Sequence, residues 1–153
     1  MDSTGERRLT VTDTDDNILA RLVREPIEIQ HISSWLGEPN CGAVLLFCGN
    51  VREYNRGKSV ARIDYHAHET MALSELRKVA QFLVHHGATR AVAIHRLGSL
   101  DVSEMSILLG IALPHRKTGF GLLEQGMEMI KSTVPIWKHE HYQDGTVEWI
   151  EGS

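Results

Sequence analysis

The sequence predicts an α+β domain with a mixed or antiparallel sheet and two main helices. Two long segments, 70–87 and 117–132, place apolar residues at helical spacing. Shorter apolar or alternating runs, bounded by glycine, proline and asparagine, lie before, between and after them and are typical of strands. No segment repeats along the chain. These observations together favour one domain over residues 17–153.

The N-terminal part of the chain predicts a tail, a strand and a short helix. Residues 1–16 are polar, with clustered aspartates, and we expect a flexible tail there. Residues 18–24 alternate apolar and polar side chains and predict the first strand. After Pro26, a short helical pattern carries Ile29, Ile32 and Leu36 on one side, and Gly37 ends it.

The segment 41–52 (CGAVLLFCGNVR) is nearly all apolar and flanked by a glycine, which favours a buried strand. Gly49 inside it predicts a bulge or a close backbone approach. The residues Asn55, Arg56 and Gly57 have turn chemistry, so we expect residues 59–68 to return beside this strand as a hairpin-like pair.

The first long helix is expected to begin at an N-cap, Thr70, and to end near Gly87. Strands are predicted over residues 88–96 and 103–113. The second of these alternates clearly, and one face carries only apolar side chains, Met105, Ile107, Leu109, Ile111 and Leu113.

The second long helix, 117–132, is predicted to bury one face formed by Phe120, Leu123, Met127 and Ile130. Its three glycines, Gly119, Gly121 and Gly126, weaken a helix and therefore indicate close packing or a close ligand. Pro135 breaks the pattern. A strand over 136–142, a turn over 143–145 and a last strand over 146–150 are expected to follow.

Composition limits the classes of function. The formal net charge of −4 argues against a general nucleic-acid-binding surface. No apolar run has the length of a membrane span, and the N-terminus lacks the apolar core of a signal peptide, so a cytosolic location is the default. The two cysteines, Cys41 and Cys48, do not form a disulfide framework, and Cys48 is expected to be a buried, unreactive thiol.

Cationic residues gather around the proline break. Lys131 and Lys138 lie on either side of Pro135, so a helix-to-strand junction there can aim both amines into one pocket. Arg52 ends an apolar strand, and His115 and Arg116 lie between a strand and a helix. Together with backbone amides at a helix start, such groups can hold a phosphate or a carboxylate.

A lysine among other cations and partly buried has a lowered pKa, and it can then act as a general acid, a general base or a nucleophile. Two lysines permit one to bind an anion while the other handles a proton. The residue pattern leaves open which lysine does which.

Histidines offer a rival site. The pairs His66/His68 and His139/His141 have strand spacing, and with Glu69 or Glu140 they could bind Zn²⁺. The alternative is that all four are exposed strand histidines without a ligand. Nothing in the spacing requires the two pairs to meet.

Taken in order, several segments resemble the large, catalytic subunit of molybdopterin synthase. The resemblance covers residues 18–149. The matching residues are Cys41-Gly42-Ala43, Phe47-x-Gly49-x-Val51-Arg52, Asn55-x-Gly57, Met71-Ala72, His95-Arg96-x-Gly98, Pro114-His115-Arg116, Lys131, Pro135-Ile136-Trp137-Lys138-x-Glu140, Asp144-Gly145 and Trp149.

This resemblance implies an α/β hammerhead-type fold and a homodimer. A small ubiquitin-like sulfur-carrier subunit would dock on each protomer, giving a heterotetramer. The carrier's C-terminal thiocarboxylate would supply sulfur to cyclic pyranopterin monophosphate, forming the dithiolene of molybdopterin. No nucleic acid or membrane takes part, and the step needs no metal or other cofactor.

The resemblance also assigns residues. By motif, Lys131 and Lys138 are the catalytic lysines. The residues expected to bind substrate or line the pocket are Arg52, His115, Arg116, Phe47, Met127 and Glu140.

Three features depart from the family pattern. His66 stands where relatives carry a glutamate, His68 replaces an aromatic residue, and His139 replaces a basic one. Two alternative functions stay open, a histidine-based metal-binding domain and a non-catalytic docking module for a β-grasp protein.

Overall fold

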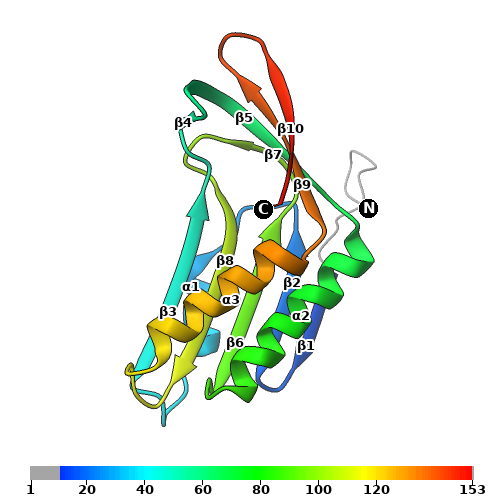
Figure 1. Cartoon of the computed structure of the whole chain (residues 1–153). Helices are drawn as coiled ribbons and strands as arrows, with labels where there is room; N and C mark the ends of the chain where they lie inside the picture. Colours follow the sequence, from blue (N-terminus) through cyan, green and yellow to red (C-terminus); the bar gives the residue numbers. More distant parts are fainter. Residues whose placement is uncertain (1–10, 153) are drawn as a thin grey trace.

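The computed structural model describes residues 11–152 and contains two sheets and three helices (Figure 1). In chain order the elements are β1 (Val11–Asp15), β2 (Ile18–Val23), α1 (Ile29–Leu36), β3 (Ala43–Asn50), β4 (Tyr54–Asn55), β5 (Lys58–Ala67), α2 (Glu69–His85), β6 (Arg90–Arg96), β7 (Gly98–Asp101), β8 (Met105–Leu113), α3 (Gly119–Thr133), β9 (Ile136–Tyr142) and β10 (Val147–Glu151).

The larger sheet has the strand order β1-β2-β6-β8-β3. Only the β2–β6 pair is parallel, and the other neighbours are antiparallel. Helices α2 and α3 pack on one face of this sheet, and α1 packs on the other against β6 and β8 (Figure 1). The sheet is therefore the middle layer of the molecule, which explains why its central strands are apolar on both sides.

The alternation in β8 divides its side chains between two cores. Ile107, Leu109 and Ile111 belong to the core under α2 and α3. Leu108 and Ala112 belong to the core under α1. The predicted alternation of this strand is confirmed, except that its first residue, Met105, packs with the second core beside the bulge in β3.

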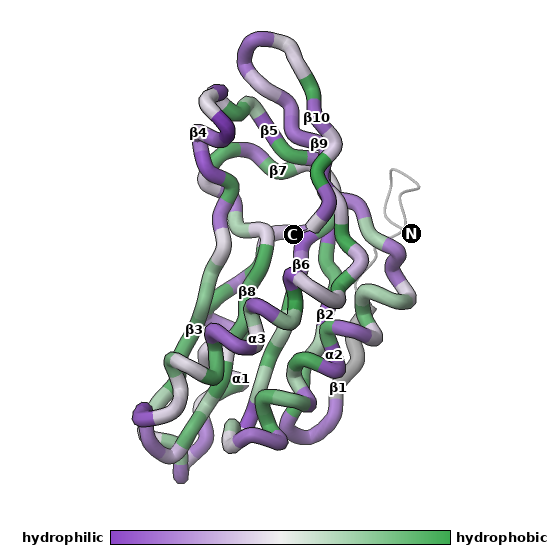
Figure 2. The backbone as a smooth tube through the Cα atoms, viewed as in Figure 1, coloured by the Kyte–Doolittle hydropathy of each residue, from purple (hydrophilic) through white to green (hydrophobic). Residues whose placement is uncertain are grey.

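The smaller sheet has the order β10-β9-β5-β4, with β7 paired to β5. It extends beyond the end of the larger sheet, above the C-terminal end of α3 (Figure 1). Figure 2 shows apolar residues along β6 and β8 and polar residues at the tips of the smaller sheet. The smaller sheet therefore carries the polar chemistry, and the larger sheet supplies the core.

The fold class predicted from the sequence is confirmed, and so are the long helices, the strands over 18–24, 88–96, 103–113 and 136–142, and the turn over 143–145. The bulge expected at Gly49 is present, because the β3–β8 register shifts between Gly49 and Asn50. Positive φ angles at Arg56 (51°) and Gly57 (76°) form the expected turn between β4 and β5.

The predicted pairing of residues 41–52 with 59–68 is wrong. β3 pairs with β8 in the larger sheet, whereas β5 pairs with β9 and β7 in the smaller one. The turn at Arg56–Gly57 joins β5 to the two-residue strand β4 instead. β3 is nearly all apolar, so it joins the larger sheet, which has helices on its faces. The chain then crosses to the smaller sheet before it reaches the turn.

Three further expectations need correction. Residues 11–15 of the expected tail form β1, which pairs with β2, and residues 1–10 lie outside the described part. β3 is an edge strand, so Val44 and Phe47 are each 39% exposed rather than buried. The N-cap of α2 is His68, whose Nδ1 accepts from the Met71 amide, and not Thr70.

The faces of α3 also differ from the expected pattern. Phe120 is 66% exposed, because the helix instead turns Gly119, Leu122, Leu123, Gly126 and Ile130 inward. Residues 98–101, for which no strand was predicted, form β7. In the part of the chain that the structure describes, no helix is long and apolar enough to cross a membrane.

Candidate functional site

The candidate site is built on β9, where Lys138, Glu140 and Tyr142 alternate with outward residues. Side chains two apart on a strand share a face, so these three project to the same side of the smaller sheet. Lys138 lies opposite Tyr65 of β5, and Glu140 lies opposite Ile63. This side of β9 faces Arg52 in the loop after β3 and Asn55 in β4.

Glu140 is a buried carboxylate at the centre of this site, with only 1% of the residue exposed. The Asn55 side-chain amide donates to both of its oxygens, at 3.0 and 2.9 Å. The Tyr142 hydroxyl donates to Oε2 at 2.7 Å, and Lys138 Nζ lies 3.8 Å from Oε1. Burial of a charge is costly unless it is paired and hydrogen-bonded, and here both conditions are met.

Lys138 is the amine that this arrangement prepares for chemistry. Its side chain is 19% exposed. Burial lowers the pKa of Lys138; Glu140 opposes this effect, and the charges of Arg52, Arg56 and Lys131 add to it, so the net shift is downward. A lysine with a lowered pKa exchanges protons more readily near neutrality.

Arg52 and Asn55 close the pocket from the other side. An Arg52 guanidinium nitrogen donates to the Asn55 carboxamide oxygen at 3.3 Å, which leaves the Asn55 amide free to face Glu140. The pocket has a volume of about 50 Å³, and its wall includes Tyr65, Lys138 and Glu140. A space of this size fits the end of a chain or a small anionic group rather than a whole substrate.

A buried histidine lies beneath the pocket. His95 is fully buried, its Nδ1 donates to the Arg96 carbonyl at 2.8 Å, and its Nε2 has no partner. Its ring meets Tyr65 edge-on, with centroids 5.1 Å apart. Burial lowers the pKa of His95 to about 4, with Lys138 acting in the same direction and the Arg96 carbonyl opposing. His95 is therefore neutral near pH 7.

Lys131 lies in the last turn of α3, as expected, and Lys138 lies on the strand that follows. Lys131 is exposed and lines a larger hollow of about 570 Å³ with Pro135, Trp137 and Glu151. The two amines thus line separate hollows on one chain, although the charge of Lys131 helps to lower the pKa of Lys138.

The other residues expected in the site are distributed unequally. Phe47 lies on the exposed edge strand β3, and Met127 packs partly buried on α3, one turn before Lys131. His115 and Arg116 are exposed beyond the end of β8, before α3 begins. From Gly119 to Lys131 the helix rises about 18 Å, so the structure does not bring this pair to the lysines of the same chain.

Neither Asn55 nor Tyr142 was predicted from the sequence as a partner of Glu140. The alternation of β9 gave a signal for Tyr142, because residues 138, 140 and 142 share a face. Asn55 belonged to the Asn-x-Gly motif but was read only as a turn residue. Cys48 is half-buried on the edge strand rather than buried as expected; partial burial raises the pKa of its thiol, and both cysteines are free.

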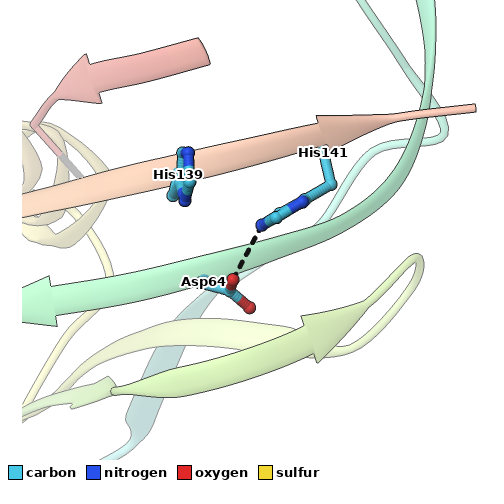
Figure 3. Close-up of side chains that lie close together, drawn as sticks. All are labelled: Asp64, His139 and His141. Atoms are coloured by element: carbon cyan, nitrogen blue, oxygen red, sulfur yellow. Dashed lines mark hydrogen bonds and ion pairs between the residues drawn. The ribbon is translucent and has the colours of Figure 1, made fainter. Parts of the chain in front are cut away.

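The histidines predicted as a rival site separate into two groups. His68 caps α2, and His66 lies near Trp137 and Trp149, with ring centroids 6.2 and 5.5 Å away. His139 and His141 lie near Asp64 of β5, on the face of β9 opposite Lys138, and the His141 ring points toward Asp64 (Figure 3). The two pairs do not form one site, and Asp64 was not foreseen.

Comparison with known proteins places these features in a family. A family model described as MoaE protein matches residues 22–133. A molybdopterin synthase catalytic subunit of Bacillus subtilis is 35% identical over 131 residues, covering 84% of this chain and 82% of the relative. A catalytic subunit of Drosophila mojavensis is 36% identical over 132 residues, and the chain spans only 36% of its length.

The fold is shared with a solved structure, the X-ray crystal structure of molybdopterin synthase from Staphylococcus aureus. The TM-score is 0.79 at 31% identity, and the match covers 85% of this chain and 95% of that one.

Proposed function

The chain belongs to the MoaE family of molybdopterin synthase catalytic subunits, and from this premise we propose that it transfers sulfur to cyclic pyranopterin monophosphate. The donor is the thiocarboxylated C-terminus of a small ubiquitin-like carrier subunit, and the product carries the dithiolene of molybdopterin. The observation that carries this proposal is the half-buried Lys138, held beside Glu140 and Arg52.

We assign the two lysines different roles from their surroundings. Lys138 is enclosed, with a carboxylate beside it, so it is the group placed to exchange protons. Lys131 is exposed at the end of α3, where a cation is favoured, and it binds a negatively charged group of the substrate or the carrier.

Each transfer forms a carbon–sulfur bond on the pterin in place of a carbon–oxygen bond, whose oxygen leaves as water or as a phosphate oxygen, and breaks the carbon–sulfur bond of the carrier. Water supplies the oxygen that returns the carrier C-terminus to a carboxylate, and the protons released pass through Lys138. Arg52, held by Asn55, faces the pocket as an anion-binding group. Glu140 fixes the Lys138 amine in place.

The proposal includes the assembly in which the reaction occurs. Two copies of the chain form a homodimer, one carrier docks on each copy, and the heterotetramer works in the cytosol. The small pocket beside Lys138 is open enough to receive a narrow chain end, such as the C-terminal residue of a carrier.

Replacement of the lysines tests the proposal. Lys138→Ala is expected to lower product formation at least about 100-fold, the usual loss when an acid–base group is removed. Lys131→Ala is expected to lower product formation through the loss of an anion-binding cation. Turnover is measured with thiocarboxylated carrier and pterin precursor, and carrier binding is measured separately by calorimetry. Lys78→Ala, an exposed lysine on α2, is the matched control.

Near-normal turnover in both lysine variants contradicts the assignment of these lysines. If the unaltered chain binds the carrier but forms no product, the chain is a docking module and the proposed activity is wrong. Loss of carrier binding in a variant would trace its defect to assembly instead of chemistry.

A further inference from the structure

The face of β9 opposite Lys138 and Glu140 carries a second cluster of polar groups. His139 and His141 of β9 lie beside Asp64 of β5, and one ligand atom from each lies within 4.8 Å of the others (Figure 3). Asp64 and His139 are register partners across the two strands. The cluster is therefore fixed by strand pairing rather than by a loop.

We propose that Asp64, His139 and His141 form a binding site for a divalent transition metal of the zinc class. Zn²⁺ binds imidazole nitrogens and carboxylate oxygens at about 2.0–2.2 Å, and a site with three protein ligands takes water as the fourth. Two imidazoles and one carboxylate on neighbouring strands match that set. Small rotations of the side chains bring their ligand atoms within coordination distance.

The neighbours of the cluster hold its members in position. His141 Nε2 lies 2.8 Å from Asp64 Oδ2, so these two groups already face each other. The His139 ring stacks on Trp149 of β10, with centroids 4.1 Å apart and planes 6° from parallel. Outer partners that fix the orientation of ligands raise metal affinity, and Trp149 does this for His139.

Arg62 competes with a metal for the same groups. Its guanidinium lies 3.4 Å from His141 Nε2 and 3.6 Å from Asp64 Oδ1. The Arg62 side chain is 47% exposed, so it can turn toward solvent when a metal binds. Removal of this cation is therefore expected to strengthen binding, which gives the proposal a test in which affinity rises.

A metal in this position would join β5 to β9 from the face opposite the pocket. Lys138 and Glu140 lie on the same strand, one residue on either side of His139. The site goes beyond sulfur transfer, since none of its three ligands lines the pocket of Lys138 or the hollow of Lys131.

Binding of Zn²⁺ to the full chain, first stripped with a chelator, tests the site by calorimetry and by metal analysis after gel filtration. One Zn²⁺ per chain is expected. Asp64→Asn, His139→Gln and His141→Gln should each weaken binding at least tenfold, while His66→Gln, a neighbouring histidine outside the cluster, should leave it unchanged. Arg62→Gln should tighten binding several-fold.

Co²⁺ provides an independent readout of the ligands. Its visible absorption should show four-coordinate nitrogen and oxygen ligation, without the sulfur charge-transfer band that Cys41 or Cys48 would produce. Absence of Zn²⁺ binding by the unaltered chain overturns the proposal, whether or not the variants fold. Equal affinity in the His139→Gln/His141→Gln double variant also overturns it, because the metal would then bind elsewhere, for example at His85 and His86.

Discussion

His95 is the clearest case of a single residue whose surroundings set a measurable property. It is buried completely, it donates one hydrogen bond to the Arg96 carbonyl, and its other nitrogen has no partner. A proton added to Nε2 would place a charge beside Tyr65 with no acceptor for it. The folded protein therefore resists protonation at this position, which lowers the pKa of His95 to about 4.

This shift makes stability depend on pH. The unfolded chain protonates His95 at its ordinary pKa of 6.5, so between pH 6.5 and 4 the unfolded state binds more protons than the folded state. The contribution of His95 is complete above about pH 6.5 and is lost as the pH falls to about 4. We expect a loss of about 3 kcal/mol of unfolding free energy over that interval.

Urea unfolding at pH 7 and pH 4 measures this effect. His95→Asn keeps a donor for the Arg96 carbonyl but cannot take up the proton, so its stability should fall about 3 kcal/mol less than that of the unaltered chain. His85→Asn, at an exposed position, is the control and should follow the unaltered chain. Parallel pH profiles for the unaltered chain and His95→Asn would show that this histidine does not titrate as described.

At the scale of elements, the glycines of α3 differ in what surrounds them. A Cβ at Gly126 would lie 2.8 Å from Leu109 Cδ2 and 3.2 Å from Leu83 Cδ2. A Cβ at Gly121 would meet nothing within 4 Å. Gly126 is thus where α3 approaches α2 and β8 closely, whereas Gly121 faces outward. Close packing, one of the two explanations that the sequence allowed, holds for Gly126 and not for Gly121.

Alanine substitution should separate the two positions. Gly121→Ala is expected to raise the free energy of unfolding by up to about 1 kcal/mol, because alanine favours the helix and meets no obstacle. Gly126→Ala gains the same propensity but crowds two leucines, so it should be less stable than Gly121→Ala by about 1–3 kcal/mol. Chemical denaturation compares them, and equal stabilisation by both would rule out close packing at Gly126.

Most elements could be predicted because their patterns are local. The alternation of β8 and the proline break before β9 mark those strands without reference to the rest of the chain. The partner of β3 could not be predicted, since a strand that is apolar on both faces fits any buried position. β7 was missed because Gly98–Asp101 is short and carries one buried side chain, Leu100.

At the scale of the whole molecule, the expected anion-binding residues lie at opposite ends of α3. Arg52 and Lys138 meet at the pocket near its C-terminal end, and His115 and Arg116 lie before its N-terminal end. Lys138 could be singled out from sequence because it lies with Lys131 beside a proline break, whereas the pocket role of Glu140 and the reaction came only from the family resemblance. The distance from this pocket to His115 and Arg116 could not be predicted from the sequence, because it depends on the length and direction of the intervening helix.

If His115 and Arg116 act on the substrate, a second copy of the chain must supply them. Lys138→Ala and Arg116→Ala proteins should each be inactive alone. In mixed dimers one of the two sites regains both residues, so random exchange of protomers should restore about a quarter of the unaltered activity.

Product formation after mixing, with mass spectrometry to verify exchange, measures this recovery. A mixture of Lys138→Ala and Lys131→Ala is the control; it should stay near zero if both lysines come from the same protomer. Verified exchange without recovery in the first mixture would show that Arg116 does not complete the pocket of a partner copy.

The alternation of β9 limits how this strand can change in evolution. Lys138 and Glu140 point to one face, and His139 and His141 point to the other. Insertion or deletion of one residue within β9 would exchange the two faces, placing histidines in the pocket and the lysine beside Asp64. Length variation among descendants of this chain should therefore concentrate at the turn over 143–145, and β9 itself should keep its length.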